Sequence, residues 1–330
     1  MRSRVRQGGA AILLALLIMT LVATLAAGMV WMQWRGIEVE SAERARGQAE
    51  WLLNAALDWG NLILKSSVRN GQAEDDLGQP WATPLAETKL SSFLSADGSH
   101  SEEGGPEAFL SGQITDAQSK YNLYNILNSP SKTEEIERLQ ILCSAIGVSP
   151  DVAATIAAGM RGSWSAVQAA KTDVDRRDTT NAVLMPIVIE NLAWYGIDPA
   201  VIKQLQPFVQ LLPASAMTPI NANTAPAEVL MVALPHISRA QAQQIILRRQ
   251  ASPIKSLNDV WAALNLPNAQ PWTPPDPGPK NQIDWKSYYF EVYGQLRYQQ
   301  HVIRERSVVY RKGPAEVQVL RRERLAPDAT

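Results

Sequence analysis

Cysteine and histidine are both scarce in this chain of 330 residues. The chain has one cysteine, Cys143, so it can form no disulfide within itself, and its three histidines are far apart in the sequence. A zinc site usually needs about four ligands of these types, so the composition argues against such a site. Cys143 lies at helical spacing from Leu139 and Ile146, which predicts a thiol buried in a core.

The sequence signatures of common enzyme classes are absent as well. The chain has no glycine-x-serine-x-glycine elbow, no phosphate-binding P-loop and no HExxH sequence. Asp173, Asp175 and Asp178 could carry out acid–base chemistry, but no partner group for them can be identified. We therefore predict that the chain is not an enzyme, and an unrecognised hydrolase is the rival interpretation. The formal net charge of -1 does not by itself indicate a nucleic-acid binder.

Charge is missing from one long stretch, Ala10–Met32, which is 23 residues of mostly apolar character. As a helix it would be about 34 Å long, enough to cross a hydrocarbon core of about 30 Å. It is preceded by Arg2, Arg4 and Arg6. The positive-inside rule then places the N-terminus in the cytoplasm and the bulk of the chain across the membrane. The alternative is a secretory signal peptide cleaved near Gly28, where the sequence has a small-x-small pattern.

The predicted helix continues beyond the membrane. No proline interrupts residues 33–67, and apolar residues recur at helical spacing as far as Leu64. We predict one helix over residues 10–65, apolar in its first half and amphipathic in its second. A plain single-pass anchor would share the apolar run, but a linker would usually follow it.

A short basic leader that ends in glycine, followed by such a helix, resembles the type IV pilin-like precursors. The resemblance implies that a prepilin peptidase cuts between Gly9 and Ala10, with a cut after Gly8 as the alternative, and that Ala10 is then N-methylated. Most members carry glutamate at the fifth mature position, where it pairs with the terminal amine of a neighbouring subunit. This chain has Leu14 there, which implies a subunit without a neighbour on one side. The protein K family of type II secretion routinely shows that departure.

In the remaining sequence the spacing of apolar residues changes twice, from alternation to helical periodicity and back to alternation. Residues 66–106 are rich in glycine, serine and acidic residues and predict surface loops. Alternation predicts a strand at Phe109–Asp116, and helical periodicity then continues for roughly 150 residues. A proline-rich stretch, Pro271–Asn281, precedes three further predicted strands. Because a lone strand needs a partner, we expect the strands on both sides of the helical block to share a sheet.

The predicted fold is therefore α+β, with a long N-terminal helix and a small antiparallel pilin-like sheet that a large all-α insertion interrupts. The resemblance implies the same architecture. The expected divisions are a leader at 1–9, a helix at 10–65 with its transmembrane part at 10–32, a pilin-like domain at 66–120 and 280–325, and the insertion at 121–279.

One part of the insertion, Pro219–Val260, resembles the helix-hairpin-helix units of competence DNA receptors, and residues 190–208 are a looser copy. We therefore expect helix-hairpin-helix or SAM-like units there. In nucleic-acid binders the hairpin is rich in glycine, so that backbone N–H groups can approach a phosphate. Here the hairpin, Leu234–Ser238, contains no glycine, and the region carries only a small positive balance. A membrane-anchored DNA receptor is nevertheless the alternative function, with Arg248 and Arg249 as its candidate contacts.

A calcium site is the alternative to the expectation that no cofactor binds. Some pseudopilins bind calcium, which needs six to eight oxygen ligands. In this chain the loop after the helix predicted to begin near Pro150 holds the candidate ligands Asp173, Asp175 and Asp178. Lys171, Arg176 and Arg177 are interleaved with them and oppose a cation, so the sequence favours a solvated turn.

The resemblance implies a minor pseudopilin at the tip of the type II secretion pseudopilus, which nucleates or caps its assembly and supports export of folded proteins across the outer membrane. The implied partners are other minor pseudopilins, the major pseudopilin, the prepilin peptidase and the inner membrane, and no nucleic acid is expected. The implied location is a single pass through the inner membrane, with the N-terminus cytoplasmic and the bulk periplasmic, followed by extraction into the periplasmic pseudopilus. The expected subunit contacts along the first helix are Gln33, Glu40, Glu43, Leu52, Leu53 and Leu57.

Overall fold

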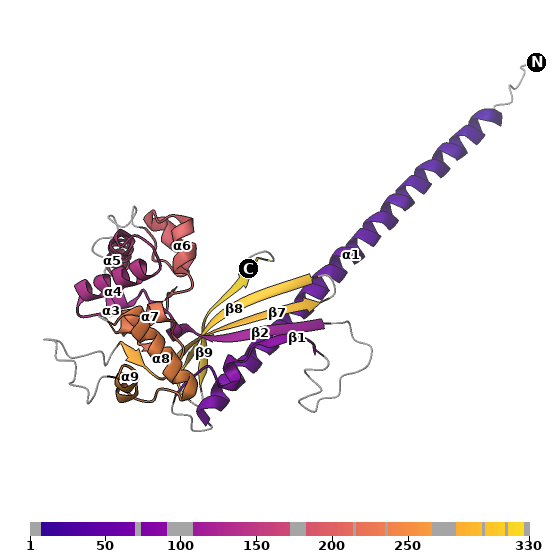
Figure 1. The fold of residues 1–330 in the computed structure, drawn as a ribbon. Coiled ribbons are helices and arrows are strands. Elements are labelled where there is room, and N and C mark those ends of the chain that lie inside the picture. Colours follow the sequence, from indigo (N-terminus) through magenta and orange to yellow (C-terminus); the bar gives the residue numbers. More distant parts are fainter. Residues whose placement is uncertain are drawn as a thin grey trace, which may run out of the picture.

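The computed structural model has a long projecting helix, a five-stranded sheet and a group of smaller helices (Figure 1). It describes residues 8–69, 74–90, 108–171, 183–213, 216–234, 237–265, 282–298, 301–313 and 316–326. The α+β architecture predicted from the sequence is confirmed.

The first helix, α1 (Gly8–Arg69), is continuous over 62 residues. From residue 10 to residue 44 every side chain is exposed, and the helix projects away from the rest of the molecule (Figure 1). Beyond that point, apolar residues four apart along the helix are buried against the sheet: Ala45, Ala49, Leu53 and Leu57. The helix can lie close to the sheet because Gly294 has no side chain there; a Cβ atom at this position would stand 3.0 Å from Leu53 Cδ1.

The sheet has five antiparallel strands in the order β1-β2-β7-β8-β9. Their bounds are β1 (Leu85–Lys89), β2 (Ala108–Asp116), β7 (Tyr289–Tyr298), β8 (His301–Arg311) and β9 (Val317–Leu325). Strands β2 and β7 pair along their whole length, from Ala108 opposite Tyr298 to Asp116 opposite Phe290. The prediction that strands on both sides of the helical block share a sheet is therefore confirmed.

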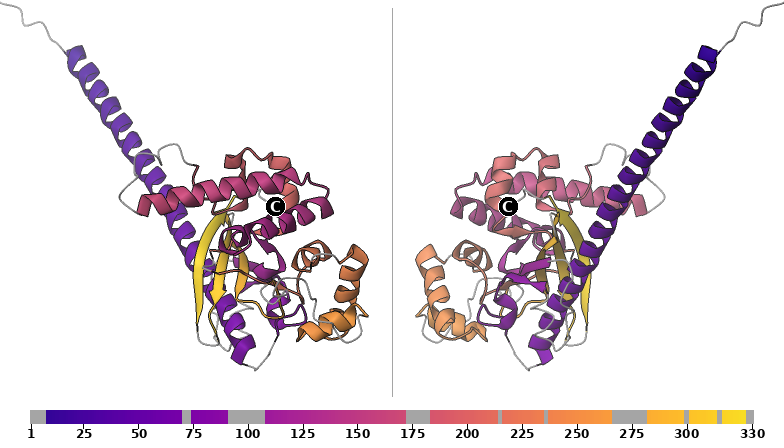
Figure 2. Two further views of the ribbon diagram at one scale, coloured as in Figure 1. Left: turned by 90° about the vertical axis from the view of Figure 1, so that its left-hand side faces the viewer. Right: turned by 90° about the vertical axis from the view of Figure 1, so that its right-hand side faces the viewer.

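The insertion between β2 and β7 is mainly helical and has a core of its own. Its longer helices are α4 (Lys132–Ala145), α5 (Asp151–Lys171) and α8 (Arg239–Ala251), and its shorter ones are α3 (Asn125–Asn128), α6 (Pro199–Leu205), α7 (Ala227–Ala233) and α9 (Leu257–Ala263). Short 3₁₀ segments also occur, namely η1 (Pro80–Ala82) before β1, η2 (Ala117–Ser119) after β2 and η4 (Ile189–Tyr195). Figure 2 shows the sheet between α1 on one side and these helices on the other.

Two parallel pairs of two-residue strands tie the insertion together near the sheet. Strand β3 (Tyr121–Asn122) pairs with β4 (Val209–Gln210), and β5 (Ile220–Asn221) pairs with β6 (Ile283–Asp284). Both pairs join residues that are far apart in the sequence. They hold the beginning, the middle and the end of the insertion close to the end of β2.

Serine side chains begin several helices of the insertion. Those of Ser238 and Ser256 cap α8 and α9 with hydrogen bonds. Ser131 stands at the start of α4 with Glu134 three residues later, the spacing of a capping box, but its side chain makes no capping hydrogen bond. Cys143 is buried, and burial raises the pKa of its thiol to about 11.

Candidate assembly surface and domain junction

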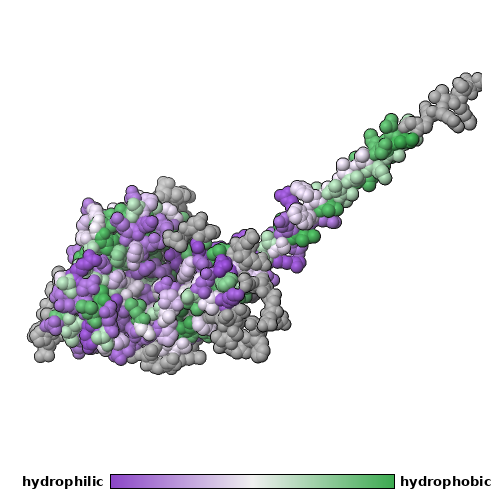
Figure 3. Space-filling view, turned by 45° about the vertical axis from the view of Figure 1, so that its right-hand side comes forward, coloured by the Kyte–Doolittle hydropathy of each residue, from purple (hydrophilic) through white to green (hydrophobic). Residues whose placement is uncertain are grey.

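The projecting half of α1 is long and apolar enough to cross a membrane, and its most apolar part is wholly exposed. Figure 3 shows hydrophobic residues gathered on the visible face of the helix near its far end. Ala10 and Leu14 lie on this exposed part, while Gly9 belongs to the first turn of α1. The peptidase cut between Gly9 and Ala10 and the methylation of Ala10 remain predictions.

The second half of α1 carries an apolar stripe on the side that faces away from the sheet. Trp51 is 80% exposed, Trp59 41% and Leu62 58%. Their separations of eight and three residues place them, together with the exposed Ala55, on one face of the helix. We call Trp51, Ala55, Trp59 and Leu62 the outer stripe. Large apolar side chains exposed in a contiguous row are typical of a protein–protein contact.

The predicted subunit contacts need a correction at two positions. Leu53 and Leu57 are buried in the chain's own core, where α1 packs on the sheet, so they are not available to another subunit. Leu52 is half-buried beside that core. Gln33, Glu40 and Glu43 are exposed, and Glu40 forms an ion pair with Arg44. Helical spacing reveals which residues share a face, but it does not say whether the chain itself or a partner covers that face.

A buried polar cluster joins the insertion to the sheet, and Asp116 at the end of β2 is its centre. Asp116 Oδ2 accepts hydrogen bonds from Ser287 Oγ at 2.6 Å, Thr224 Oγ1 at 2.5 Å and Asn221 Nδ2 at 3.0 Å. Its Oδ1 accepts from the backbone N–H of Gln118 at 2.7 Å. Burial is the largest influence on this carboxyl and raises its pKa to about 6, although the hydrogen bonds oppose that rise.

A second carboxylate in the cluster is paired with arginine. Arg311 Nη2 lies 2.5 Å from Asp75 Oδ2, and both side chains are almost completely buried. Arg311 also donates to the carbonyl oxygen of Ser287 at 2.7 Å and to Ser67 Oγ at 2.9 Å, and it stacks on Phe290 with its guanidinium 4.6 Å from the ring centre. The pair therefore links α1, the segment before β1, and strands β7 and β8.

Asparagine side chains make further links within the insertion. Asn122 and Asn125, which follow β2, bind the backbone of Leu212 and Thr218 through both their donor and acceptor atoms. Asn223 does the same to the backbone of Ile254. Asn122 and Asn125 stand just after the predicted strand Phe109–Asp116, and such a concentration of amide side chains beside a strand end is a sequence signal for buried polar contacts.

The basic residues of the helix-hairpin-helix region are largely engaged within the chain. Arg249 donates from Nη1 to the carbonyl oxygens of Ala222 and Ala225, each at 2.7 Å. Burial lowers the pKa of Arg249 to about 10. Arg239 pairs with Glu228, and Lys255 pairs with Glu74 at 2.9 Å. Arg249, a candidate contact of the alternative DNA receptor, therefore uses its guanidinium to hold the turn after β5.

The calcium candidates Asp173, Asp175 and Asp178 lie outside the described residues. Among the residues that the structure does describe, no group of three or more histidine, cysteine, aspartate or glutamate side chains is placed to hold a metal ion. Calcium binding stays a prediction.

Comparison with known proteins covers both the insertion and the whole chain. Residues 220–278 match the family model described as "Type II secretion system (T2SS), protein K". A type II secretion system protein K from Pectobacterium carotovorum subsp. carotovorum is 27% identical, and the match covers 97% of each chain. The chain is therefore similar over nearly its whole length to a type II secretion system protein K. A second protein K, from Pseudomonas aeruginosa, is 24% identical over 77% of this chain and 75% of its own.

A solved structure shares the fold of this chain. A chain in the crystal structure of the GspK-GspI-GspJ complex from the enterotoxigenic Escherichia coli type 2 secretion system is similar, with a TM-score of 0.63 and 22% identity, over 86% of this chain and 98% of that one. The matched family segment begins at Ile220, so it includes Asn221, Asn223 and Thr224 of the buried junction. Protein K is a structural component of the secretion machinery, a minor pseudopilin, and the apolar helix is consistent with a single-pass membrane anchor.

Proposed function

We propose that this chain forms the tip of a type II secretion pseudopilus, where it starts or caps assembly with other minor pseudopilins and supports the export of folded proteins. The observation that carries this proposal is the division of α1 into an exposed apolar half and a half whose outer stripe remains uncovered. The first half would lie in the inner membrane before assembly and among neighbouring helices afterwards, once the leader has been cut between Gly9 and Ala10.

The outer stripe is the proposed contact with other subunits. It follows the polar stretch that contains Gln33, Glu40 and Glu43, which are also exposed. Burying an exposed tryptophan contributes roughly 1.5–3 kcal/mol or more, because its apolar area leaves water. The complex in which the similar structure was solved names GspI and GspJ beside GspK, which supports minor pseudopilins as the partners of this chain.

The tip position is supported by where the insertion lies. In Figure 1 the helical block is at the end of the molecule opposite to the projecting half of α1. A subunit added beyond it would meet this block instead of an open helix. Leu14, which offers no carboxylate to pair with a neighbour's terminal amine, fits a subunit that ends the row.

The test is co-purification of the full-length chain with the other minor pseudopilins of its own system from detergent-solubilised membranes. We expect Trp51→Glu to abolish co-purification and secretion, because a charge would be buried in the contact. The matched control is Trp164→Glu on α5, since Trp164 is also exposed, at 37%, and lies in the insertion. Equal behaviour of the two variants would refute the proposed contact. N-terminal mass spectrometry of the same sample should find N-methylated Ala10, and a start near Gly28 would exclude a pilin-like subunit.

A further inference from the structure

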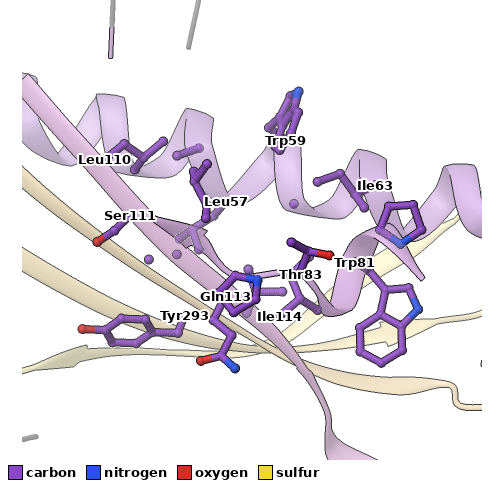
Figure 4. Close-up of a pocket in the computed structure, with 18 residues that line it drawn as sticks. Leu57, Trp59, Ile63, Trp81, Thr83, Leu110, Ser111, Gln113, Ile114 and Tyr293 are labelled. Carbon is purple, nitrogen blue, oxygen red and sulfur yellow. The ribbon is translucent and has the colours of Figure 1, made fainter. Parts of the chain in front are cut away.

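An apolar pocket of about 230 Å³ opens between α1 and the β1–β2 edge of the sheet (Figure 4). Ile63 and Trp59 line it from α1, Trp81 and Thr83 line it from the segment before β1, and Leu110 and Ile114 line it from β2. Trp59 stands at the rim on the α1 side in Figure 4. The pocket is separate from the polar junction around Asp116.

The wall of this pocket is fixed before anything binds. Trp81 is only 1% exposed, its Nε1–H donates to Gln79 Oε1 at 2.5 Å, and its ring meets Phe290 edge-on with 5.2 Å between the ring centres. A pocket whose wall needs no rearrangement lowers the entropic cost of binding. Gly60 allows α1 to lie close to β7 beside the pocket. A Cβ atom at this position would stand only 3.2 Å from Val292 Cγ1.

The chemistry of the lining restricts the occupant. None of the described residues that line the pocket has a charged side chain. Its few polar side chains, those of Thr83, Ser111, Gln113 and Tyr293, leave most of the surface apolar. A dry cavity of about 150 Å³ in another protein accepts benzene, so this space is large enough for one aromatic or branched apolar side chain.

The pocket is continuous with the outer stripe, because Trp59 belongs to both. A helix that packs along Trp51, Ala55 and Trp59 inserts one row of side chains into the groove beside that stripe. We propose that the pocket receives one large uncharged side chain, such as leucine, methionine or phenylalanine, from the amphipathic helix of a neighbouring minor pseudopilin. This inference rests on the proposed function and locates the anchoring point of the contact.

The first test places a photo-crosslinking amino acid at Thr83 in the full-length chain, in cells that carry the complete secretion system. Thr83 is exposed at the rim, so the probe needs no change in the core. We expect a crosslink to another minor pseudopilin that the same probe at Thr155, exposed on α5, does not give. A crosslink from Thr83 to lipid, or to this chain's own residues 91–107, would overturn the inference.

The second test fills the pocket with Thr83→Trp. We expect the affinity for the neighbouring pseudopilin to fall about tenfold, equivalent to roughly 1.4 kcal/mol, with thermal unfolding unchanged, whereas Thr155→Trp leaves the affinity unchanged. If Trp51→Glu abolishes co-purification and Thr83→Trp has no effect, the pocket is not the anchor although the proposed function stands. If neither variant has an effect, both proposals fail. Should Thr83→Trp not fold, the crosslinking result alone decides.

Discussion

The two cores of this molecule and the junction between them are built from different materials. Each core is apolar: the insertion buries residues such as Leu139 and Leu230, and the sheet with α1 buries residues such as Leu53 and Phe290. The junction is mostly made of carboxylates, amides, hydroxyls and a guanidinium, with a small apolar cluster of Ala117, Leu212 and Val308 beside them. Apolar contacts tolerate small rotations, whereas hydrogen bonds between buried groups have strict geometry. The comparison teaches that the cores supply stability and the junction fixes how the insertion is oriented on the sheet.

Removing the buried cation should have the largest effect on this arrangement. Arg311→Met leaves Asp75 buried without its partner, and we expect the free energy of unfolding to fall by about 3–5 kcal/mol. Chemical unfolding of the full-length chain in detergent measures this. The control is Lys312→Met, whose ion pair with Glu316 is exposed and should contribute less than about 1 kcal/mol. Similar losses in both variants would mean that the buried pair has no special role.

The next effect depends on pH and on Asp116. Burial raises the pKa of this carboxyl from 3.8 to about 6. Below about pH 4 both the folded and the unfolded chain carry the proton, but between about pH 4 and 6 only the folded chain does. Unfolding then releases a proton, so rising pH destabilises the folded state, by up to about 3 kcal/mol for two pKa units, with no further loss above about pH 6.

The variant Asp116→Asn isolates the contribution of this one carboxyl to the pH dependence of stability. We expect the variant to lose the fall in stability between about pH 4 and 6, because asparagine does not titrate. The measurement is the unfolding midpoint at several pH values for both proteins, with Asp151→Asn on the exposed start of α5 as the control. An unchanged pH profile in Asp116→Asn would show that the junction is already ionised at acidic pH.

The smallest effect concerns two adjacent arginines. Arg249→Gln removes the bonds to the carbonyl oxygens of Ala222 and Ala225 and should cost about 1–2 kcal/mol of stability. Arg248→Gln, at an exposed position, should change it by no more than about 0.5 kcal/mol. Thermal unfolding of the two variants compares them. Retention of the full-length chain on DNA-cellulose at physiological salt, abolished by Arg248→Glu, would support the DNA-receptor alternative and contradict the purely structural role of this region.

Much of the fold could be predicted from the sequence because its periods are strong. The uncharged run Ala10–Met32 and the alternation in Phe109–Asp116 each favour one structure, and the partnerless strand pointed to the β2–β7 pair. Strand β1 was not predicted, since its five residues alternate poorly and contain three polar or charged side chains. Spacing alone could not show that Leu53 and Leu57 are buried inside the chain and do not contact another subunit. The sheet that covers this face of α1 is formed by residues much later in the sequence.

The polar junction was beyond sequence reasoning for a related reason. Asp116, Thr224 and Ser287 are separated by more than sixty residues from one to the next, and each is of a type usually found at the surface. Only the folded chain brings them within hydrogen-bonding distance. The partners of Asn122 and Asn221 also lie far away in the sequence, at Leu212 and Asp116.

Strands β2 and β7 are direct neighbours, so the helical block leaves the sheet and returns to it at almost the same place, with Asp116 opposite Phe290. Both attachment points belong to the same antiparallel strand pair, β2 and β7. A segment anchored in this way can be lengthened, shortened or exchanged during evolution without disturbing the strands beneath it. The shape of the helical block could therefore change while the packing of α1 on the sheet stays constant.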